Sequence, residues 1–411
     1  MPNTVRHSLG RWLRRHSLTL VATIGGATGV ALAVAKFAPD ASPPAAIASA
    51  ANPGAAGGEI ARDTAQDTVQ IVLILDTSSS MNGLINQARA HLWKMVDDMG
   101  KITRVVDGKT RGVKIELALY EYGNDTLASE TGYIRQVSAF SSDLDSVSEK
   151  LEALFTNGGS EFAGQAIQVA VNDLPWSKDP SALRFVFLAG NESFDQGPVA
   201  ASAAMQIAAD RDITVQLIHC GDQEPTWSAA ALLAKTDLTH IDQNQVAAHI
   251  PAPQDAEIMR LGGQLNSTYV AYGAQGQASA ARQTAADASS AKMSAKVAIE
   301  RTQMKAKRAY KNENWDVVDA VEKDKDWLGK AKDGDLPAEM QGKTLEEKQA
   351  FVAKKTAERA ELKKQIAKLE AERAAFIAAE KAKSGTSDAP SLESEMMKST
   401  KKAAAKKGYK F

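Results

Sequence analysis

The sequence has few of the side chains on which disulfide, redox and zinc chemistry depend. Its 411 residues include one cysteine, Cys220, which excludes an internal disulfide and any zinc or redox site of the CxxC type. The six histidines contain no pair at the HExxH spacing of a zinc protease. No GxxxxGK(S/T) segment is present either, so the chain carries no P-loop for a nucleoside triphosphate.

An excess of charge of one sign is also missing. The 49 Lys and Arg residues nearly balance the 50 Asp and Glu residues, and the formal net charge of −1 gives no sign of a nucleic-acid-binding protein. Aromatic residues make up only 6% of the chain, whereas hydrophobic residues reach 44%, which is enough for an ordinary core. At roughly 150 residues per domain, the length corresponds to about two or three structural units.

The first part of the chain has the pattern of an export signal. Four arginines within the first 15 residues precede an uncharged, largely apolar run over residues 18–35. A basic segment followed by an apolar one is typical of secretory signals, with the positive charge kept on the cytoplasmic side. We therefore predict that residues 1–37 are a signal peptide or an inner-membrane anchor, with both alternatives open, and that the protein is exported to the periplasm. The Pro/Ala/Gly-rich residues 38–64 are expected to form a flexible linker.

Residues 65–252 alternate between strand-like and helical segments. An aliphatic run at 69–75 is typical of a strand buried on both faces of a parallel sheet. Apolar residues at helical spacing follow at 83–99. Further strands are expected at 113–120, 133–137, 183–189, 214–220 and 239–242. Strands that alternate with helices predict an α/β fold of the doubly wound, Rossmann-like class, with a mostly parallel sheet and ligands at the carboxyl ends of its strands.

The composition changes after residue 252, where the strand signal ends and Ala, Lys, Glu and Arg dominate. We predict a C-terminal helical region over residues 253–395, with one long helix at 345–383. Charged residues interrupt the coiled-coil positions of that helix, which favours packing against a partner helix over a long autonomous coiled coil. Residues 396–411 carry many lysines and are expected to form a solvated basic tail. Weak contact of this tail with anionic lipid or polymer is the alternative.

The segment 76–81, DTSSSM, follows the first buried strand directly and is the most informative part of the sequence. A carboxylate and two hydroxyls, on Asp76, Ser78 and Ser80, can converge from this one loop. Hard oxygen ligands of this kind suit Mg²⁺ or Mn²⁺, with water in the remaining positions. A serine-rich cap of the following helix is the simpler interpretation.

An Asp-x-Ser-x-Ser motif in this α/β context resembles the first loop of the metal-ion-dependent adhesion site, or MIDAS, of the von Willebrand factor A (vWA) family. The resemblance covers residues 69–250. In that family, a second loop supplies a Thr, a third loop supplies an Asp, and a carboxylate of the bound partner completes the coordination of the metal. Ser160 stands at the position of the family's Thr, within the segment NGGSE at 157–161. The resemblance thus implies that Asp76, Ser78, Ser80 and Ser160 hold the ion.

The third loop departs from the family pattern, because Gly190 stands where the Asp is expected. The neighbouring Asn191 or Glu192 could substitute for it. Glu161, beside Ser160, could take part in the site or serve only as a favourable charge at the start of the next helix. Asp125 is expected on the same rim. The segments 188–194 and 240–244 also resemble an exported bacterial branch of the family that carries a C-terminal helical region.

The resemblance implies a protein that is not an enzyme. Its expected function is Mg²⁺- or Mn²⁺-dependent binding of a protein partner that presents an Asp or Glu, with no nucleic acid involved. One alternative is a metal-independent scaffold that acts through its helical region. The other is a hydrolase on a doubly wound sheet, which would use Asp76 or a pair formed by His219 and Cys220.

Overall fold

Seven strands and twelve α-helices make up the part of the chain that the computed structural model describes, residues 62–411 without 223, 245–248 and 386–389. All of these residues belong to one compact unit. The predicted signal or anchor at 1–37, with its apolar run at 18–35, lies outside the described residues, as does nearly all of the linker at 38–64. Because β1 already begins at Arg62, the linker prediction extends too far. Among the described helices, none combines the length and apolar character needed to cross a membrane.

The strands and helices alternate through about the first half of the described chain, and only helices follow. The strands are β1 (Arg62–Asp76), β2 (Thr103–Val106), β3 (Lys109–Tyr122), β4 (Ile134–Ser141), β5 (Leu183–Gly190), β6 (Thr214–Cys220) and β7 (Thr239–Ile241). The helices among them are α1 (Asn82–Met99), α2 (Leu144–Glu152), α3 (Ala163–Asp173), α4 (Ala201–Asp210) and α5 (Pro225–Ala234). After β7 come α6 (Asp255–Asn266), α7 (Gly276–Met293), α8 (Ala295–Lys305), α9 (Val317–Lys323), α10 (Trp327–Lys330), α11 (Leu345–Ser384) and α12 (Leu392–Lys406).

One sheet contains all seven strands, in the order β2-β3-β1-β5-β6-β7, with β4 also paired to β3. The four pairings that involve β1, β5, β6 and β7 are parallel, and only β2 and β4 run antiparallel to β3. The predicted α/β fold with a doubly wound, mostly parallel sheet is therefore confirmed. Asp76 at the end of β1 stands opposite Tyr122 in β3, and Leu75 stands opposite Ala189 in β5. This register brings the carboxyl ends of the three central strands together.

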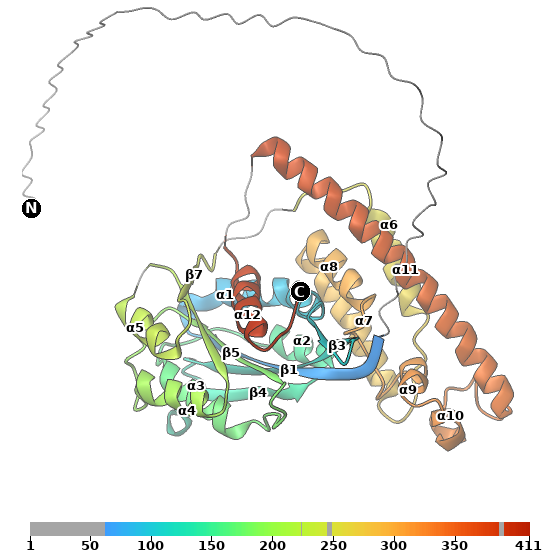
Figure 1. Ribbon diagram of the computed structural model, residues 1–411, viewed down its shortest axis with the longest axis horizontal. Coiled ribbons are helices and arrows are strands. Elements are labelled where there is room, and N and C mark those ends of the chain that lie inside the picture. Colours follow the sequence, from blue (N-terminus) through green and yellow to red (C-terminus); the bar gives the residue numbers. More distant parts are fainter. Residues whose placement is uncertain (1–61, 223, 245–248, 386–389) are drawn as a thin grey trace, which may run out of the picture. The chain divides into compact units, whose positions relative to one another are not determined.

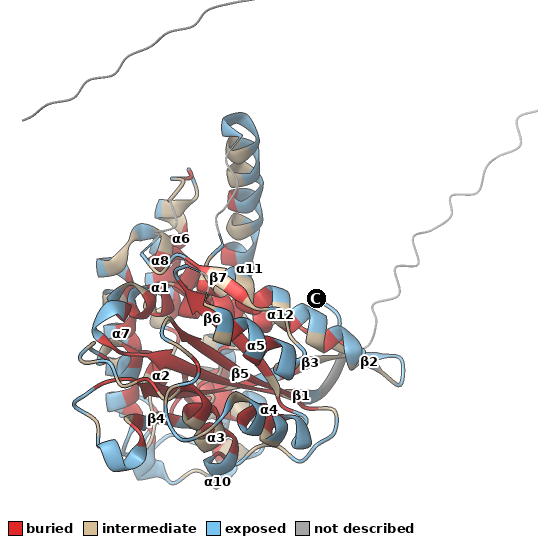
Figure 2. Ribbon diagram, turned by 90° about the vertical axis from the view of Figure 1, so that its left-hand side faces the viewer, coloured by how far each residue is buried: buried red, intermediate tan, exposed pale blue. Residues whose placement is uncertain are grey.

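Alternate residues of β1 enter two cores, one on each face of the sheet. Leu73 and Leu75 pack in the core under α1, α2 and α12, whereas Val72 and Ile74 pack in the core under α3, α4 and α5. Figures 1 and 2 show the sheet between these two helical layers, with its strands buried. Burial on both faces explains why the run at 69–75 lacks the polar alternation of a half-exposed strand.

The last helix, α12, returns to the sheet and completes the face that α1 covers. Its Leu392, Met396 and Ala404 are buried in the same core as α1. Beyond it, Lys410 exchanges two backbone hydrogen bonds of 2.8 Å with Thr103 of β2. The predicted solvated tail at 396–411 is therefore wrong, and so is the end of the helical region at 395. The lysines here occupy the outer side of an amphipathic helix, as Lys398 does with 75% of its side chain exposed.

Helices α6 to α11 thus form an insertion between β7 and α12 rather than a terminal extension. Arg301 of α8 stacks over the ring of Trp93 in α1 at 4.2 Å and pairs with Asp145 of α2 at 2.8 Å. Ser290 of α7 accepts a hydrogen bond of 3.0 Å from the indole Nε1 of Trp93. These buried contacts fix α7 and α8 to the helices of the sheet domain, which comprises β1 to β7, α1 to α5 and α12.

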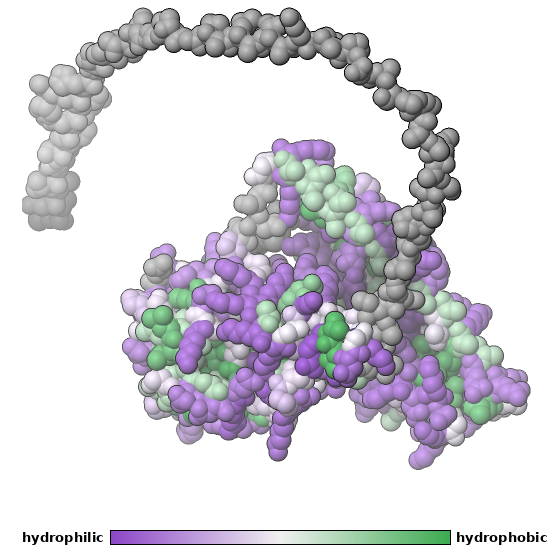
Figure 3. Space-filling model, in the orientation of Figure 1, coloured by the Kyte–Doolittle hydropathy of each residue, from purple (hydrophilic) through white to green (hydrophobic). Residues whose placement is uncertain are grey.

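The longest helix, α11, has 40 residues and therefore a length of about 60 Å. It begins at a capping box, in which Thr344 and Glu347 each accept a hydrogen bond from the backbone of the other. In its middle, the buried Arg359 binds Asp316 at 2.7 Å and Asp319 at 3.1 Å. The helix predicted at 345–383 is confirmed, and it packs along α6 and α9 within the inserted region. Apolar and charged surfaces are intermixed along its outer side (Figure 3).

Candidate functional site

The candidate site lies where the three central strands end. Asp76 is the last residue of β1, Tyr122 the last of β3 and Gly190 the last of β5. After Asp76, the chain passes through a short 3-10 turn, Ser79–Met81, directly into α1. The site thus occupies the edge at which a parallel sheet offers its loops to a ligand, as the sequence predicts.

Asp76 is fully buried, and only one of its two carboxyl oxygens has a hydrogen-bond partner. Its Oδ1 accepts a hydrogen bond of 2.7 Å from the backbone N–H of Ser78, whereas its Oδ2 is buried without any hydrogen-bond partner. Burial raises the pKa of Asp76 to about 6, although hydrogen bonds from Glu161 and Ser78 work in the opposite direction. A buried carboxyl oxygen without a partner is costly, and this one therefore indicates a missing ligand.

Glu161, in the second loop, supplies a second buried carboxyl group beside Asp76. Burial and the charge of Asp76 raise the pKa of Glu161 to about 9, and its Oε2 likewise has no hydrogen-bond partner. A Cβ on Gly123, whose φ is +80°, would lie 2.7 Å from Cγ of Glu161 and 2.9 Å from Oδ1 of Asp76. Gly123 therefore leaves the room in which the two carboxyl groups meet.

The serine hydroxyls of the first loop extend the site toward the third loop. Ser78 Oγ lies 3.3 Å from Ser80 Oγ, which donates to the side-chain oxygen of Asn191 at 3.4 Å. Ser160 is half-buried in the second loop, and its hydroxyl forms no hydrogen bond with these side chains or elsewhere in the described part of the chain. The structure thus joins Asp76, Ser78 and Ser80 with Asn191 and Glu161, and leaves Ser160 beside them.

Tyr122 explains why no side chain can extend from the end of β5. A Cβ on Gly190 would lie 2.2 Å from the hydroxyl oxygen of Tyr122 and 3.1 Å from Oδ2 of Asp76. A side chain at position 190 would thus point at Asp76, but the tyrosine hydroxyl fills its space. Sequence analysis missed Tyr122, although the end of the strand at 113–120 marks it as a neighbour of Asp76.

The remaining predicted residues lie on the exposed rim of the site. The Asp125 side chain packs against Gly158 of the second loop, since a Cβ there would lie 2.1 Å from its Cγ. Glu192 is exposed, and its backbone oxygen accepts a hydrogen bond of 2.6 Å from Nε1 of Trp227. Neither carboxylate joins the hydrogen bonds of the buried cluster within the described residues. Both belong to the surface that surrounds it.

The buried cluster fits a small divalent cation. Oδ2 of Asp76 and Oε2 of Glu161 are the two carboxyl oxygens that lack partners, and serine hydroxyls lie next to them. In residues 62–411, apart from the undescribed positions, no three His, Cys, Asp or Glu side chains gather in a metal-binding group. A cation here would therefore use hydroxyls and water besides the two carboxylates, which is the ligand chemistry of Mg²⁺ and Mn²⁺.

The strand order and the three loops, one after β1, one between α2 and α3 and one after β5, identify the fold. The sheet domain has a vWA-like fold. The similar solved structures described next share little sequence with the chain, at 11–16% identity. The thread protein PTMP1 from the mussel byssus is 11% identical at a TM-score of 0.33, and the match covers 43% of this chain and 42% of that one. The chain therefore spans less than half the length of PTMP1.

BatB from Bacteroides thetaiotaomicron is 16% identical at a TM-score of 0.32, and the match covers 42% of this chain and 90% of that one. The vWA domain of SpRpn10 is 13% identical, with a TM-score of 0.32 and coverage of 43% and 88%. One structure of PTMP1 has a MIDAS motif occupied by zinc. No protein-family model and no curated protein sequence matches the chain.

The vWA-type domain does not form the nucleophilic pair that the hydrolase alternative needs. His219 and Cys220 are consecutive in β6 and therefore point to opposite faces of the sheet. The His219 ring lies against Trp227, whereas Cys220 is buried in the core under α1. Burial raises the pKa of the Cys220 thiol far above neutrality, so the reactive thiolate does not form.

Proposed function

We propose that this vWA-type domain is a metal-dependent protein-binding module in which Asp76, Ser78, Ser80 and Glu161 hold Mg²⁺ or Mn²⁺. The pair of buried carboxyl oxygens without partners, one on Asp76 and one on Glu161, carries the proposal. A bound cation would supply an open coordination position for a carboxylate oxygen of the partner.

The electrostatics of the pair support a cation between these loops. Two carboxyl groups in contact within a buried site cannot both ionise without a compensating charge. That repulsion and the burial are what raise the pKa of Glu161 to about 9. A divalent ion supplies the missing charge and lowers the pKa of both carboxyl groups.

Glu161 also accounts for the missing third-loop carboxylate. The family pattern places an Asp at position 190, where this chain has glycine and the Tyr122 hydroxyl fills the space. Glu161 brings a carboxyl group to the same Asp76 from the second loop. In this proposal the number of acidic ligands is kept and the loop that supplies one of them changes, while Ser160 contributes its hydroxyl as a further ligand.

The rim supports a partner with a particular charge pattern. Asp125 and Glu192 are exposed around the buried cluster, and the negative charge of Glu192 acts on Glu161. Phe155, with 57% of its surface exposed, adds an apolar residue near Asp125, since its backbone oxygen accepts a hydrogen bond of 2.9 Å from the side chain of the adjacent Asn124. We infer that the partner presents one Asp or Glu flanked by basic and apolar residues, because a strongly acidic surface would be repelled.

Titration calorimetry of Mg²⁺ and Mn²⁺ into the full chain tests this proposal. We expect saturable binding in the wild type, no binding in Asp76→Ala and at least tenfold weaker binding in Glu161→Gln. Glu257→Gln is the matched control, since this exposed carboxylate only pairs with Arg260 on the surface of α6. Wild-type protein that binds neither ion would exclude the metal-dependent function.

The metal-independent scaffold remains the second candidate, because the pair of Asp76 and Glu161 can also share a proton, which removes one of its two negative charges and the repulsion between them. In that case the inserted helices would make the contacts, and chelation with EDTA would leave partner binding unchanged. We further propose export to the periplasm, on the sequence of residues 1–37. Fractionation of cells, followed by mass determination of the purified chain, distinguishes a cleaved signal from a retained anchor.

A further inference from the structure

Apolar side chains are exposed at the amino edge of the sheet, the edge where its parallel strands begin and the one opposite Asp76. Leu232 and Leu233, in the last turn of α5, have 79% and 48% of their surface exposed. Just after α5, the hydroxyl of Thr236 donates at 2.9 Å to the backbone oxygen of Val215, near the start of β6. This contact places the two leucines at the amino edge. Figure 3 shows apolar surface over α5 with strongly polar surface beside it.

A second pair of exposed apolar side chains lies further along the same edge. Val105 of β2 stands opposite Thr110 of β3, which in turn stands opposite Arg62, the first residue of β1. Val105 is 55% exposed, and Phe411, which follows the residue that pairs with β2, is 44% exposed. β2 and β6 are four strand spacings apart in the sheet, which corresponds to about 19 Å. The exposed apolar groups are therefore spread along an extended surface.

The second half of α12 joins these two apolar parts and adds positive charge. The hydroxyl of Ser399 donates to the side-chain oxygen of Gln216 in β6, and Lys410 pairs with Thr103 in β2. Residues 396–411 contain six lysines and no acidic residue. Five of these lysines are exposed: Lys398, Lys401, Lys402, Lys406 and Lys410. Lysine can lay its methylene groups on apolar surface while its ammonium group stays in water.

Two acidic residues next to this edge are paired with lysines of α12 and its end. Lys402 binds Asp237 at 2.7 Å, and Lys407 binds Asp212 at 2.6 Å, on the two sides of the groove between α12 and the end of α5. Lys407 also donates at 2.9 Å to the backbone oxygen of Ala182, just before β5. These contacts fix α12 against the starts of β5 and β6. The other exposed lysines then leave an excess of positive charge on its outer side.

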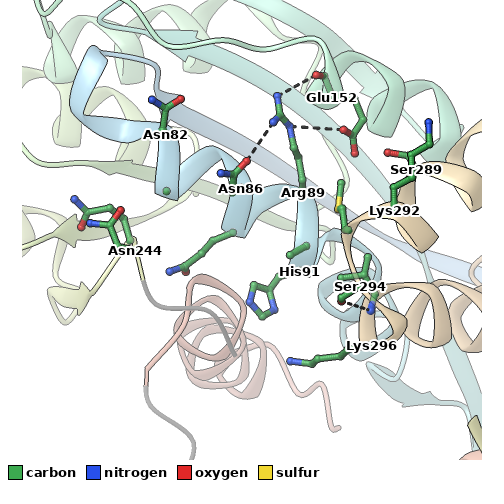
Figure 4. Close-up of a pocket in the computed structure, with 16 residues that line it drawn as sticks. Asn82, Asn86, Arg89, His91, Glu152, Asn244, Ser289, Lys292, Ser294 and Lys296 are labelled. Carbon is green, nitrogen blue, oxygen red and sulfur yellow. Dashed lines mark hydrogen bonds and ion pairs between the residues drawn. The ribbon is translucent and has the colours of Figure 1, made fainter. Parts of the chain in front are cut away.

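A cavity on α1 lacks this combination of groups. It has a volume of about 710 Å³ and lies between α1 and the junction of α7 and α8 (Figure 4). Among the described residues, none of the large hydrophobic side chains that are exposed lines it. Its Arg89 is held by hydrogen bonds to the backbone oxygens of Leu151 and Glu152. Exposed apolar groups and a row of lysines thus occur together at the amino edge rather than at this cavity.

We propose that the amino edge and the outer side of α12 bind the surface of an anionic phospholipid bilayer. The lysines of α12 contact the lipid phosphates, and Leu232, Leu233 and Phe411 enter the boundary between headgroups and acyl chains. Lysines clustered on an amphipathic helix bind anionic lipid, and adjacent apolar groups strengthen the attachment. A bilayer reaches both apolar parts at once, because it is wide and needs no matching shape.

This orientation agrees with two further features of the fold. The chain enters the sheet at the amino edge, where β1 begins, so a membrane segment upstream of β1 would be joined to this same edge. The carboxyl edge, with Asp76 at the end of β1, lies at the opposite end of the strands. Lipid bound at the amino edge would therefore leave the proposed metal site free to meet a partner.

A fluorescent label on Leu232→Cys in the full chain tests the contact with lipid. The native Cys220 is buried and its thiolate does not form, so a nitrobenzoxadiazole label attaches at position 232. With vesicles of phosphatidylglycerol and phosphatidylcholine, we expect the emission to shift to the blue and at least to double. Vesicles of phosphatidylcholine alone should leave it unchanged. A label on Asp195→Cys, exposed after β5 at the carboxyl edge, should not respond. Because each label reports only its own surroundings, attachment of the chain through residues 1–37 does not produce this pattern.

The charge of α12 is tested in the chain labelled at position 232. The triple variant Lys398→Gln/Lys401→Gln/Lys406→Gln should lower the response to anionic vesicles at least threefold. The matched control, Lys354→Gln/Lys364→Gln/Lys368→Gln, removes three exposed lysines of α11 and should respond as the parent does. Asp76→Ala should retain the full response. Because that variant abolishes the proposed metal site, failure of the lipid surface and failure of the metal site can be distinguished.

The proposal is overturned if the label at position 232 does not respond to anionic vesicles, or if the label at position 195 responds as strongly. An equal response to phosphatidylcholine alone, or an equal response of the triple variant on α12, would exclude the role of the lysines. A response that appears without lipid and grows with protein concentration would assign the surface to a second copy of the chain instead.

Discussion

Replacing Gly190 with alanine tests the packing that keeps side chains away from the end of β5. A Cβ at this position would lie 2.2 Å from the hydroxyl oxygen of Tyr122 and 3.1 Å from Oδ2 of Asp76, and both residues are buried. Adding a methyl group to a well-packed interior costs about 1–3 kcal/mol. Because the 2.2 Å contact involves a ring held within the core, we expect Gly190→Ala to lower the free energy of unfolding by about 2 kcal/mol.

A double-mutant cycle with Tyr122→Phe assigns this loss to the hydroxyl. Within the described residues, the hydroxyl forms only one long hydrogen bond, of 3.5 Å, to the backbone oxygen of Ala189. Its removal alone should therefore cost less than about 1 kcal/mol. In the double variant, we expect at least ~1 kcal/mol of the loss at Gly190 to be recovered.

The measurement is guanidinium unfolding of the four proteins, followed by tryptophan fluorescence in the presence of EDTA. Gly263→Ala in α6 is the matched control, since nothing lies within 4 Å of a Cβ there and alanine favours a helix by about 0.5–1 kcal/mol. The reasoning would be refuted if Gly190→Ala stayed within ~0.5 kcal/mol of the wild type. It would also be refuted if the two substitutions showed no coupling.

The remaining predictions concern the buried charges and the last helix. Burial raises the pKa of Glu300 to about 7 from its ordinary value of 4.5, so between these pH values the folded chain retains a proton that the unfolded chain loses. Stability is therefore highest below pH 4.5 for this group and falls as the pH rises toward 7, by up to about 3 kcal/mol; Glu300→Gln should remove this part of the pH dependence of unfolding. Arg359→Met should destabilise the chain by about 3–5 kcal/mol and speed hydrogen exchange in α11, because it leaves the buried Asp316 without its cation and Asp319 with only a 3.7 Å contact to Lys311; Arg260→Met, at an exposed pair, should have almost no effect. Met396→Ala should cost about 2–5 kcal/mol in thermal or chemical unfolding, whereas Lys398→Ala should have almost no effect, since Met396 is buried in the sheet core and Lys398 is exposed.

Hydrophobic patterning was sufficient to predict the sheet. The run at 69–75 is buried on both faces, as its lack of polar residues predicts. The alternation of strands and helices can be read from short stretches of sequence, because it depends on hydrophobic periodicity rather than on distant contacts. The same applies to Asp76, Ser78 and Ser80, which lie together on one short loop and so need no long-range information. The expected place of the site, at the carboxyl ends of the strands, follows from the parallel connections.

The return of α12 to the sheet could not be predicted from composition. Its many lysines suggest a solvated tail, but Leu392, Met396 and Ala404 recur on one side of the helix and enter the core beside α1. That side of α12 has only a few apolar positions, so the helix is buried only if another surface of the protein is there to pack against it. The surface exists only once β5, β6 and α1 are assembled, and an inserted region of six helices separates them from α12 in sequence.

In the proposed site, a residue from another loop compensates for a local departure from the family pattern. Gly190 by itself indicates a lost acidic ligand, and the sequence offers Asn191 and Glu192 as neighbouring substitutes, whereas Glu161 lies in the second loop. The degree of burial distinguishes the two carboxylates, because Glu192 is exposed, whereas only 3% of the surface of Glu161 is accessible. A carboxyl group is rarely buried unless a partner neutralises it. The burial of Glu161 beside Asp76, with Gly123 making the space for both, is therefore the strongest physical indication that this position serves the site rather than the start of α3.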